Sequence, residues 1–179
     1  GKRKPEDNNE YFDEPDDVAQ KAKQTAEIIR SSKHLIAFTG AGLSTSAGIP
    51  DYRGPQGVWT LKEKGAGSHP GLSVLQVDGG DVAPTRAHMC LVGLYRVGLL
   101  KFVISQNIDG LHVRSGLPQD CLAELHGNTN VERCASCGRT YWRPYHVRNP
   151  KNGAHNHATG RTCDACSGPL QDTIVNFGE

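Results

Sequence analysis

Two pairs of closely spaced cysteines constrain this 179-residue chain more than any other feature of its sequence. Cys134 and Cys137 form the first pair, and Cys163 and Cys166 form the second. Cysteines separated by two residues can hold one ion from a tight turn, and two such turns complete a tetrahedron of sulfurs. We therefore expect residues 128–170 to form a small zinc-binding module with four cysteine ligands. Such a closed Zn2+ site is structural, because it leaves no coordination position for a catalytic water.

Two other roles for these cysteines, in disulfides or in redox chemistry, fit the rest of the sequence less well. Two disulfides would be typical of a secreted protein, but they predict a signal peptide and leave Cys90 and Cys121 unexplained. A redox-active Cys-x-x-Cys needs only one pair. His155 and His157 lie between the pairs, but side chains separated by one residue rarely close on one ion. We therefore interpret both histidines as loop residues.

The charge balance limits the classes of partner. Lys and Arg number 20 against 19 Asp and Glu, so the formal net charge is +1. A global basic field for nucleic acid is excluded by this balance, whereas a local patch is not. No apolar run approaches the length that spans a bilayer, so we expect no membrane partner.

The N-terminal part of the chain has a charged segment followed by a segment with regularly spaced apolar residues. Residues 1–17 are rich in charge and poor in apolar side chains, so we expect a flexible charged arm. Val18, Ala22, Ala26 and Ile29 then recur at helical spacing. This recurrence predicts an amphipathic helix.

Short apolar runs and the segments between them indicate the fold class. Runs at 35–38, 101–105 and 173–177 predict buried strands. Two helices are expected between the first two strands, one starting at 43–47 and one over 84–94, with a long loop of functional character over 48–80. This order predicts an α/β fold, in which a parallel sheet carries the metal module as an insert.

A glycine turn follows the first expected strand. Gly40, Ala41 and Gly42 lead into Ser44 and Thr45 at the start of the expected helix. Glycines let a ligand approach the backbone, and the amides of a helix N-terminus bind phosphate. The dehydrogenase fingerprint is broken because Thr45 stands where its third glycine belongs. The turn predicts a bound dinucleotide without hydride transfer, and a tight turn without a ligand is the alternative.

Several motifs occur in the order of a known family. They are Gly40-Ala41-Gly42-Leu43-Ser44, Gly48-Ile49-Pro50-Asp51-Tyr52-Arg53, Ser105-Gln106-Asn107-Ile108-Asp109-Gly110-Leu111-His112, Leu125-His126-Gly127 and the two cysteine pairs. From about residue 18 to its end the chain resembles the sirtuin family of NAD-dependent protein deacylases, and within it the nuclear class IV branch. That family continues into a second half of the Rossmann sheet. We therefore expect this chain to be an N-terminal part of a catalytic domain.

The resemblance implies the following roles for single residues. His126 is the expected general base, because an imidazole exchanges protons near neutral pH. Asn107 and Asp109 complete the expected catalytic set and orient the ribose and the nicotinamide amide, although an Asx turn before Gly110 also suits Asp109. The expected NAD contacts are Gly40, Ala41, Gly42, Ser44, Thr45, Asp51, Tyr52, Arg53, Trp59, Gln106, Asn107, Ile108, Asp109 and His126. Residues 18–127 and 171–179 would form the incomplete NAD-binding part.

The same resemblance implies an activity. The expected reaction transfers an acyl group from a protein lysine to ADP-ribose and releases nicotinamide. Its expected substrate is a histone-like nuclear protein, with a nuclear or nucleolar location and association with chromatin or nucleic acid. Mono-ADP-ribosyl transfer is an alternative that begins at the same bond of NAD. A non-catalytic, zinc-stapled scaffold that binds chromatin is an alternative of another class.

Overall fold

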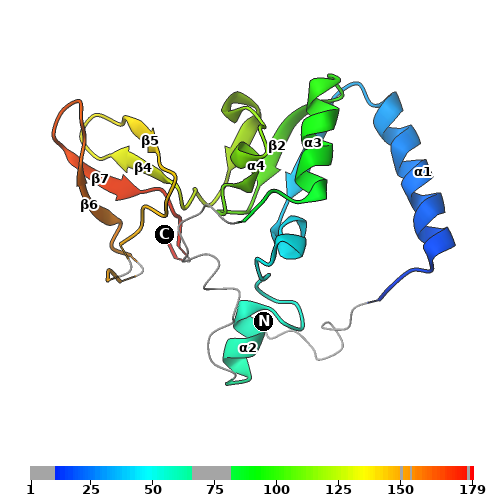
Figure 1. Ribbon diagram of the computed structural model, residues 1–179, viewed down its shortest axis with the longest axis horizontal. Coiled ribbons are helices and arrows are strands. Elements are labelled where there is room, and N and C mark those ends of the chain that lie inside the picture. The colour runs from blue at the N-terminus through cyan, green and yellow to red at the C-terminus, as the bar shows by residue number, and fades with distance from the viewer. Residues whose placement is uncertain (1–10, 66–81, 150, 154, 177) are drawn as a thin grey trace.

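The computed structural model describes residues 11–65, 82–149, 151–153, 155–176 and 178–179. Its strands form two separate sheets, which lie side by side in Figure 1. The first is parallel and has the order β1-β2-β3, with β1 at Leu35–Thr39, β2 at Leu100–Ser105 and β3 at Leu122–Glu124. The second is antiparallel and has the order β5-β4-β7-β6, with β4 at Val131–Cys134, β5 at Thr140–Trp142, β6 at Ala158–Thr162 and β7 at Pro169–Asp172.

The parallel sheet buries one face under a helix. Helix α3 (Arg86–Arg96) contacts β2, and its first turn is capped by Thr85, whose side chain accepts from the amide of His88. Val92 of α3 packs with Val103 of β2 in the main apolar cluster. The other buried members of this cluster are Leu100, Leu117 and Cys121. The predicted α/β fold is confirmed, because a parallel sheet and a covering helix form this core.

The antiparallel sheet carries the paired cysteines. Strand β4 lies at its centre between β5 and β7, and Cys134 at the end of β4 faces Leu170 of β7. Cys134, Cys163 and Leu170 form a small buried cluster against which Tyr141 packs. The metal module therefore has its own hydrophobic centre, and β7 runs across the expected boundary between residues 170 and 171.

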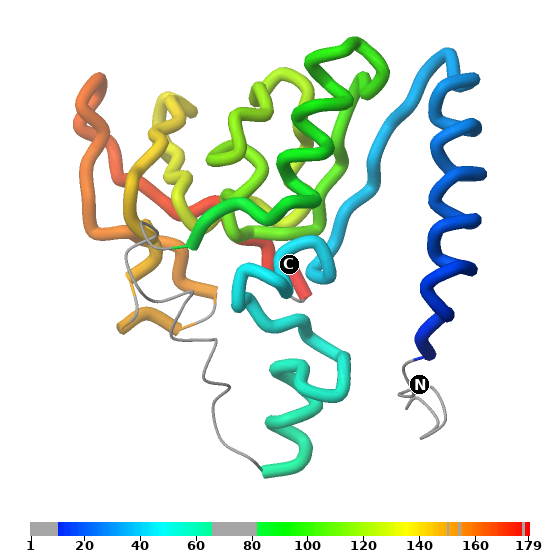
Figure 2. The backbone as a smooth tube through the Cα atoms, turned by 45° about the vertical axis from the view of Figure 1, so that its right-hand side comes forward, coloured from blue at the N-terminus to red at the C-terminus, as the bar shows by residue number. Residues whose placement is uncertain are grey.

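The remaining helices differ in how closely they pack on the sheets. Helix α1 (Pro15–Ser31) stands at the far end of the molecule from β4–β7 in both views, and it has no buried residue (Figures 1 and 2). Helix α2 (Val58–Glu63) lies within the expected loop, and α4 (Leu111–Arg114) follows β2. In the part of the chain that the structure describes, no helix combines the length and apolar character needed to cross a bilayer.

Two of the expected elements are wrong. Residues 41–47 form two 3-10 turns, η2 (Ala41–Leu43) and η3 (Thr45–Ala47), instead of an α-helix. Gly48 follows at φ 85°, a left-handed conformation that ends the second turn. Residues 173–176 form no strand, and Phe177 lies outside the described residues, as do residues 1–10 of the arm and 66–80 of the loop.

The third strand of the parallel sheet is therefore another segment. It is β3, which pairs with β2 from Val103 to Ser105 and which the sequence did not predict. The end of the expected arm also differs, because α1 already begins at Pro15.

Candidate functional site

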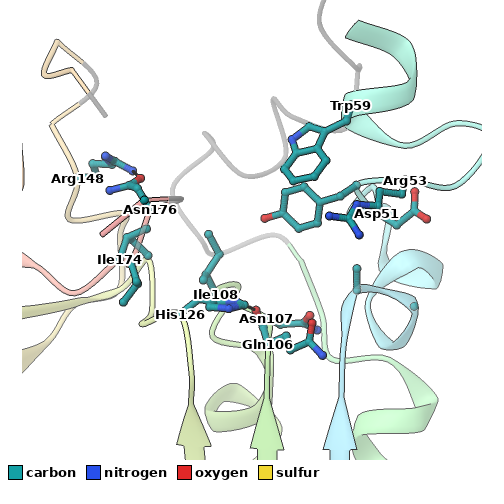
Figure 3. Close-up of a pocket in the computed structure, with 15 residues that line it drawn as sticks. Asp51, Arg53, Trp59, Gln106, Asn107, Ile108, His126, Arg148, Ile174 and Asn176 are labelled. Carbon is teal, nitrogen blue, oxygen red and sulfur yellow. Dashed lines mark hydrogen bonds between the residues drawn. The ribbon is translucent and has the colours of Figure 1, made fainter. Parts of the chain in front are cut away.

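A pocket of about 690 Å³ opens at the carboxyl ends of β1 and β2. This is the edge where side chains from neighbouring parallel strands converge, and its volume lies within the range of small-molecule sites. Its lining residues are Ala41, Gly42, Asp51, Tyr52, Arg53, Trp59, Gln106, Asn107, Ile108, His126, Arg148, Ile174, Val175, Asn176 and Gly178. In Figure 3, Arg53 and Trp59 lie on one side, Arg148 and Asn176 lie opposite, and His126 lies between them.

The structure brings most of the expected NAD contacts to this pocket. Ten of them line it, from the glycine turn, the loop before α2, the first turn of α2, the loop after β2 and the turn after β3. The other four do not line it, and these are Gly40, Ser44, Thr45 and Asp109. Ser44 is buried directly behind the lining residues, where it supports them.

The glycine turn offers open backbone to the pocket. A Cβ atom added at Gly40 or at Gly42 would meet nothing within 4 Å. The absence of side chains therefore leaves space for a ligand against the main chain of Ala41 and Gly42. Because short 3-10 turns replace the expected helix, a helix dipole plays no part in this arrangement.

Ser44 joins the two polar residues expected in catalysis. Its hydroxyl donates to Oδ2 of Asp109 at 2.6 Å and accepts from Nδ2 of Asn107 at 3.2 Å. Nδ2 of Asn107 also donates to the carbonyl of Gly40 at 3.0 Å. Oδ1 of Asp109 accepts from the amide of Leu111 at 2.9 Å, so the expected local turn and the polar network occur together. These bonds fix the amide of Asn107 at the pocket edge.

His126 is held in one orientation by the neighbouring strand end. Its Nδ1 lies 2.9 Å from the carbonyl oxygen of Gln106. A carbonyl only accepts, so in the neutral ring Nδ1 carries the proton and donates it. Nε2 is then the nitrogen with a free lone pair. The carbonyl of His126 accepts from the amide of Val175 at 3.0 Å, which fixes its main chain as well.

An aromatic and cationic wall faces His126 across the pocket. The rings of Tyr52 and Trp59 lie 5.5 Å apart, and the guanidinium carbon of Arg53 lies 5.0 Å from the centre of the Trp59 ring. Oδ2 of Asp51 accepts from the amide of Gly54 at 2.8 Å and so closes the loop that carries them. This wall offers stacking surface and one positive charge to a ligand.

The opposite wall contains the functional candidates that the sequence analysis missed. Ile174, Val175, Asn176 and Gly178 had been assigned to a strand or to the chain end, and Arg148 had been assigned to the metal module. Nη1 of Arg148 donates to Oδ1 of Asn176 at 3.3 Å. Only the apolar run at 173–177 hinted at this wall, and nothing in its pattern separates a pocket wall from a core strand.

Two buried histidines lie beneath the site. Nε2 of His112 lies 2.9 Å from the hydroxyl of Thr39, and its ring contacts that of His88 at 4.9 Å between centres. Burial, and then the neighbouring His88, lower the pKa of His112 to about 4, although Asp109 opposes the shift. Burial likewise lowers the pKa of His88. Both rings are therefore neutral at physiological pH.

A partly buried carboxyl group lies near these histidines. Burial raises the pKa of Glu124 to about 7 even though Asn128 donates to its Oε1 at 2.6 Å, and Asp109 raises it further. Glu124 ends β3 two residues before His126. Glu124 is therefore close to the midpoint of its titration at neutral pH.

The four paired cysteines converge on one point of the metal module. Their sulfur atoms all lie within 4.8 Å of one another, with Cys134 3.5 Å from Cys166 and Cys137 3.6 Å from Cys163. Four sulfurs at ~2.3 Å from one zinc ion stand ~3.8 Å apart, whereas a disulfide is ~2.05 Å long. None of the six cysteines forms a disulfide. The donor set therefore fits Zn2+.

His155 and His157, which lie between the two cysteine pairs, contact carboxylates. Nδ1 of His155 lies 2.8 Å from Glu179, and His157 lies between Glu179 at 2.9 Å and Asp172 at 2.8 Å. Among the described residues, the one group of three or more metal-binding side chains is the four cysteines.

Comparison with known proteins agrees with this geometry. The model of the Sir2 family matches residues 72–179. NAD-dependent protein deacetylase sirtuin-7 of Homo sapiens is 46% identical over 172 residues, which cover 95% of this chain and 41% of that protein. The chain thus spans about two fifths of the length of this relative.

Two solved structures also resemble the chain. A Sir2 homologue in complex with NAD gives a TM-score of 0.59 at 29% identity and covers 88% of this chain and 62% of its own. A Sir2 mutant with a p53 peptide and NAD gives a TM-score of 0.55 at 28% identity and covers 88% of this chain and 64% of its own. With the family model matching more than half of its residues, the chain belongs to the Sir2 family.

Proposed function

We propose that this chain provides the nicotinamide-side half of an NAD-dependent protein-lysine deacylase. The observation that carries the proposal is the orientation of His126, whose Nδ1 is engaged by the carbonyl of Gln106 so that Nε2 is the free nitrogen of a pocket-lining ring. The open backbone of Ala41 and Gly42 and the wall of Tyr52 and Trp59 give that pocket room for a dinucleotide.

The proposed chemistry divides between ligand and protein. Bound NAD supplies an ADP-ribosyl acceptor and nicotinamide as the leaving group. Nε2 of His126 accepts a proton from a ribose hydroxyl and thereby makes that oxygen a nucleophile toward the acyl carbon. Asn107, held by Gly40 and Ser44, offers a fixed amide to the ribose and the nicotinamide, with Asp109 behind it. Trp59, Tyr52 and Arg53 exclude water and bind the cofactor from the opposite side.

The proposed substrate is an acyl-lysine in a protein. A solved Sir2 structure similar to this chain holds a p53 peptide together with NAD, which supports a peptide site in this family. We extend the proposal to histone-like substrates, a nuclear or nucleolar location and association with chromatin or nucleic acid, as the resemblance to the class IV branch implies. Deacetylation of acetylated histone peptides, and the location of a fluorescent fusion in cells, test these extensions.

The proposed role of the second sheet is structural. Cys134, Cys137, Cys163 and Cys166 would hold Zn2+ in a closed tetrahedral site, and the module of residues 128–170 would support the pocket without acting on the substrate. Residues 18–127 and 171–179 would supply the NAD contacts.

Nicotinamide release is the direct test of the activity. The full-length protein that contains this chain, incubated with NAD and an acetyl-lysine peptide, is expected to release nicotinamide and deacetylated peptide in equal amounts. His126→Gln should lower the rate by about 10²–10⁴-fold, because it removes the proton acceptor. His34→Gln is the matched control, because His34 is exposed and lies outside the pocket.

Each outcome assigns one function. Zinc-loaded, folded full-length protein that consumes no NAD with any acyl peptide would contradict the enzyme and favour the scaffold. Nicotinamide release accompanied by a mass increase of the target protein, without loss of acyl groups, would identify ADP-ribosyl transfer instead.

A further inference from the structure

Tyr141 connects the metal cysteines to a buried ion pair. Its hydroxyl oxygen lies 3.0 Å from Sγ of Cys163. The same oxygen accepts a hydrogen bond from the amide of Asp164 at 3.1 Å. Tyr141 lies on β5 directly opposite Glu132 of β4. One side chain therefore reaches a sulfur ligand, the turn that carries this ligand, and the centre of the sheet.

The direction of the bond to Cys163 follows from the donors available. The hydroxyl oxygen of Tyr141 already accepts from the amide of Asp164, and its own proton is not used there. A cysteine that binds metal is a thiolate, which has no proton to donate. The phenol therefore donates to the sulfur, and the acceptor is charged, which makes this one of the stronger kinds of hydrogen bond.

Arg143 holds the ring of Tyr141 in place. Its guanidinium carbon lies 4.9 Å from the centre of the Tyr141 ring, a cation–π distance. Its Nε donates to Oε1 of Glu132 at 2.7 Å, and Nε of Arg161 donates to Oε2 of the same carboxylate at 2.7 Å. Glu132 is fully buried, so the carboxylate is fixed between two guanidinium groups. Arg143 in turn has little freedom to leave the ring.

We propose that Tyr141 is a positioning residue of the metal site, which donates to the Cys163 thiolate and is held in place by Arg143 and Glu132. The proposal rests on zinc occupancy of the four cysteines, and it is independent of the deacylase activity. A donor to one sulfur withdraws negative charge from a site in which four thiolates surround one dication. It also fixes the turn at Asp164 in the geometry that the metal requires.

The expected loss without this donor is measurable. Removing a hydrogen-bonding partner of a metal ligand costs about 10–100-fold in metal affinity. A Tyr141 ring that contributed by packing alone would show no such loss, because phenylalanine keeps the ring.

Tyr145 provides a matched control within the same module. The guanidinium carbon of Arg161 lies 5.4 Å from the centre of the Tyr145 ring, so this ring meets the second arginine of Glu132. Among the described contacts, its hydroxyl makes no hydrogen bond to any of the four sulfurs. Each of the variants Tyr141→Phe and Tyr145→Phe removes a hydroxyl group but keeps the aromatic ring beside its arginine. The two variants therefore differ in whether the lost hydroxyl contacted a sulfur.

Zinc competition and cobalt absorption test the proposal on the full chain. Competition with a chromophoric zinc chelator should show affinity about 10–100-fold lower in Tyr141→Phe and unchanged in Tyr145→Phe. With Co2+ in place of zinc, the sulfur-to-metal charge-transfer band should shift in Tyr141→Phe alone. Equal affinities and identical bands in the two variants and the original chain would overturn the proposal, as would equal losses in both variants. An original chain that binds no zinc would overturn it together with the metal assignment, whatever the activity.

Discussion

His112 is a buried residue whose charge state the fold controls. It is 2% exposed, and its Nε2 contacts Thr39 at the end of β1, directly beneath the pocket. Protonating the ring would place a charge against His88 in a site closed to water. The structure therefore requires a neutral ring, and burial is the main cause of its pKa of about 4.

The free energy of unfolding is predicted to fall as the pH is lowered from 6.5 to about 4. The unfolded chain binds a proton at His112 near pH 6.5, whereas the folded chain does so only near pH 4. The folded state thus binds fewer protons between these values, and the free energy of unfolding rises with pH across the window. At ~1.4 kcal/mol for each pKa unit, the contribution is at most about 3–4 kcal/mol, present above pH 6.5 and lost by pH 4.

Denaturant unfolding between pH 4 and 7.5 measures this effect. His112→Gln should give a shallower pH dependence than the original chain, because the titrating group is gone. His34→Gln should leave the dependence unchanged, because His34 is exposed. Identical slopes in the original chain and in His112→Gln would contradict the prediction.

Two elements meet closely at Gly127, which follows His126. A Cβ atom at Gly127 would overlap the carbonyl oxygen of Thr173, and the residue has φ +77°. Both features demand glycine, since the left-handed region and the close backbone approach each exclude a side chain. This contact brings the turn after β3 against the segment that leaves β7.

Gly127→Ala is predicted to destabilise the fold. The free energy of unfolding should fall by about 2–5 kcal/mol, from the combined cost of backbone strain and overlap. Gly93→Ala is the control, because Gly93 lies within α3 and an added Cβ meets nothing within 4 Å. That change should stabilise by about 0.5–1 kcal/mol. A neutral result at Gly127 would show that the two segments separate easily.

The sequence predicted those elements whose own residues carry the pattern. β1 contains the apolar run Leu35–Phe38, β2 contains the run Phe102–Ile104, and α3 has an apolar face and a threonine cap. The three-residue β3 has no period to detect, because its strand character comes from pairing with β2. At 173–176 a strand was predicted, but none forms. The main-chain amide of Val175 donates to the carbonyl of His126, and the hydroxyl of Thr173 donates to the carbonyl of Asn128, so this segment bonds to a turn and not to a strand.

The same reasoning explains how much of the site could be anticipated. Asn107 follows β2, which was predicted, so its place at the carboxyl edge of the sheet was accessible from the sequence. His126 follows β3, which was not predicted, so only its motif pointed to the site. The wall formed by Arg148 and Asn176 depends on how the second sheet packs against the first. No local pattern encodes such a long-range contact.

At the scale of the whole molecule, the two sheets have different sources of stability. The parallel sheet has a core under α3, whereas the cluster that the four-stranded sheet buries around Cys134, Cys163 and Leu170 is small. Small modules with so little apolar burial depend on a bound metal. The metal proposed for the four sulfurs would therefore decide whether β4–β7 form.

Removing zinc is predicted to unfold the second sheet and spare the first. Trp142 on β5 and Trp59 on α2 are the two tryptophans of the chain, so a Trp59→Phe variant reports on the module alone. Excess chelator should shift the Trp142 emission to longer wavelength, while amides of β1 and β2 keep their protection from hydrogen exchange. Added Zn2+ should restore the emission, and added Mg2+ should not.

An unchanged Trp142 spectrum in demonstrably metal-free protein would contradict this dependence. Loss of protection throughout β1 and β2 would instead show that the two sheets unfold as one cooperative unit.

The segment that leaves β7 gives the molecule a short mechanical linkage. Leu170 lies opposite Cys134, and five residues later the amide of Val175 bonds to the carbonyl of His126. A displacement of Cys134 would therefore be passed to His126 through residues 170–175. Damage to the cysteines and loss of turnover should accordingly be hard to separate in this protein, although no sulfur lies in the pocket.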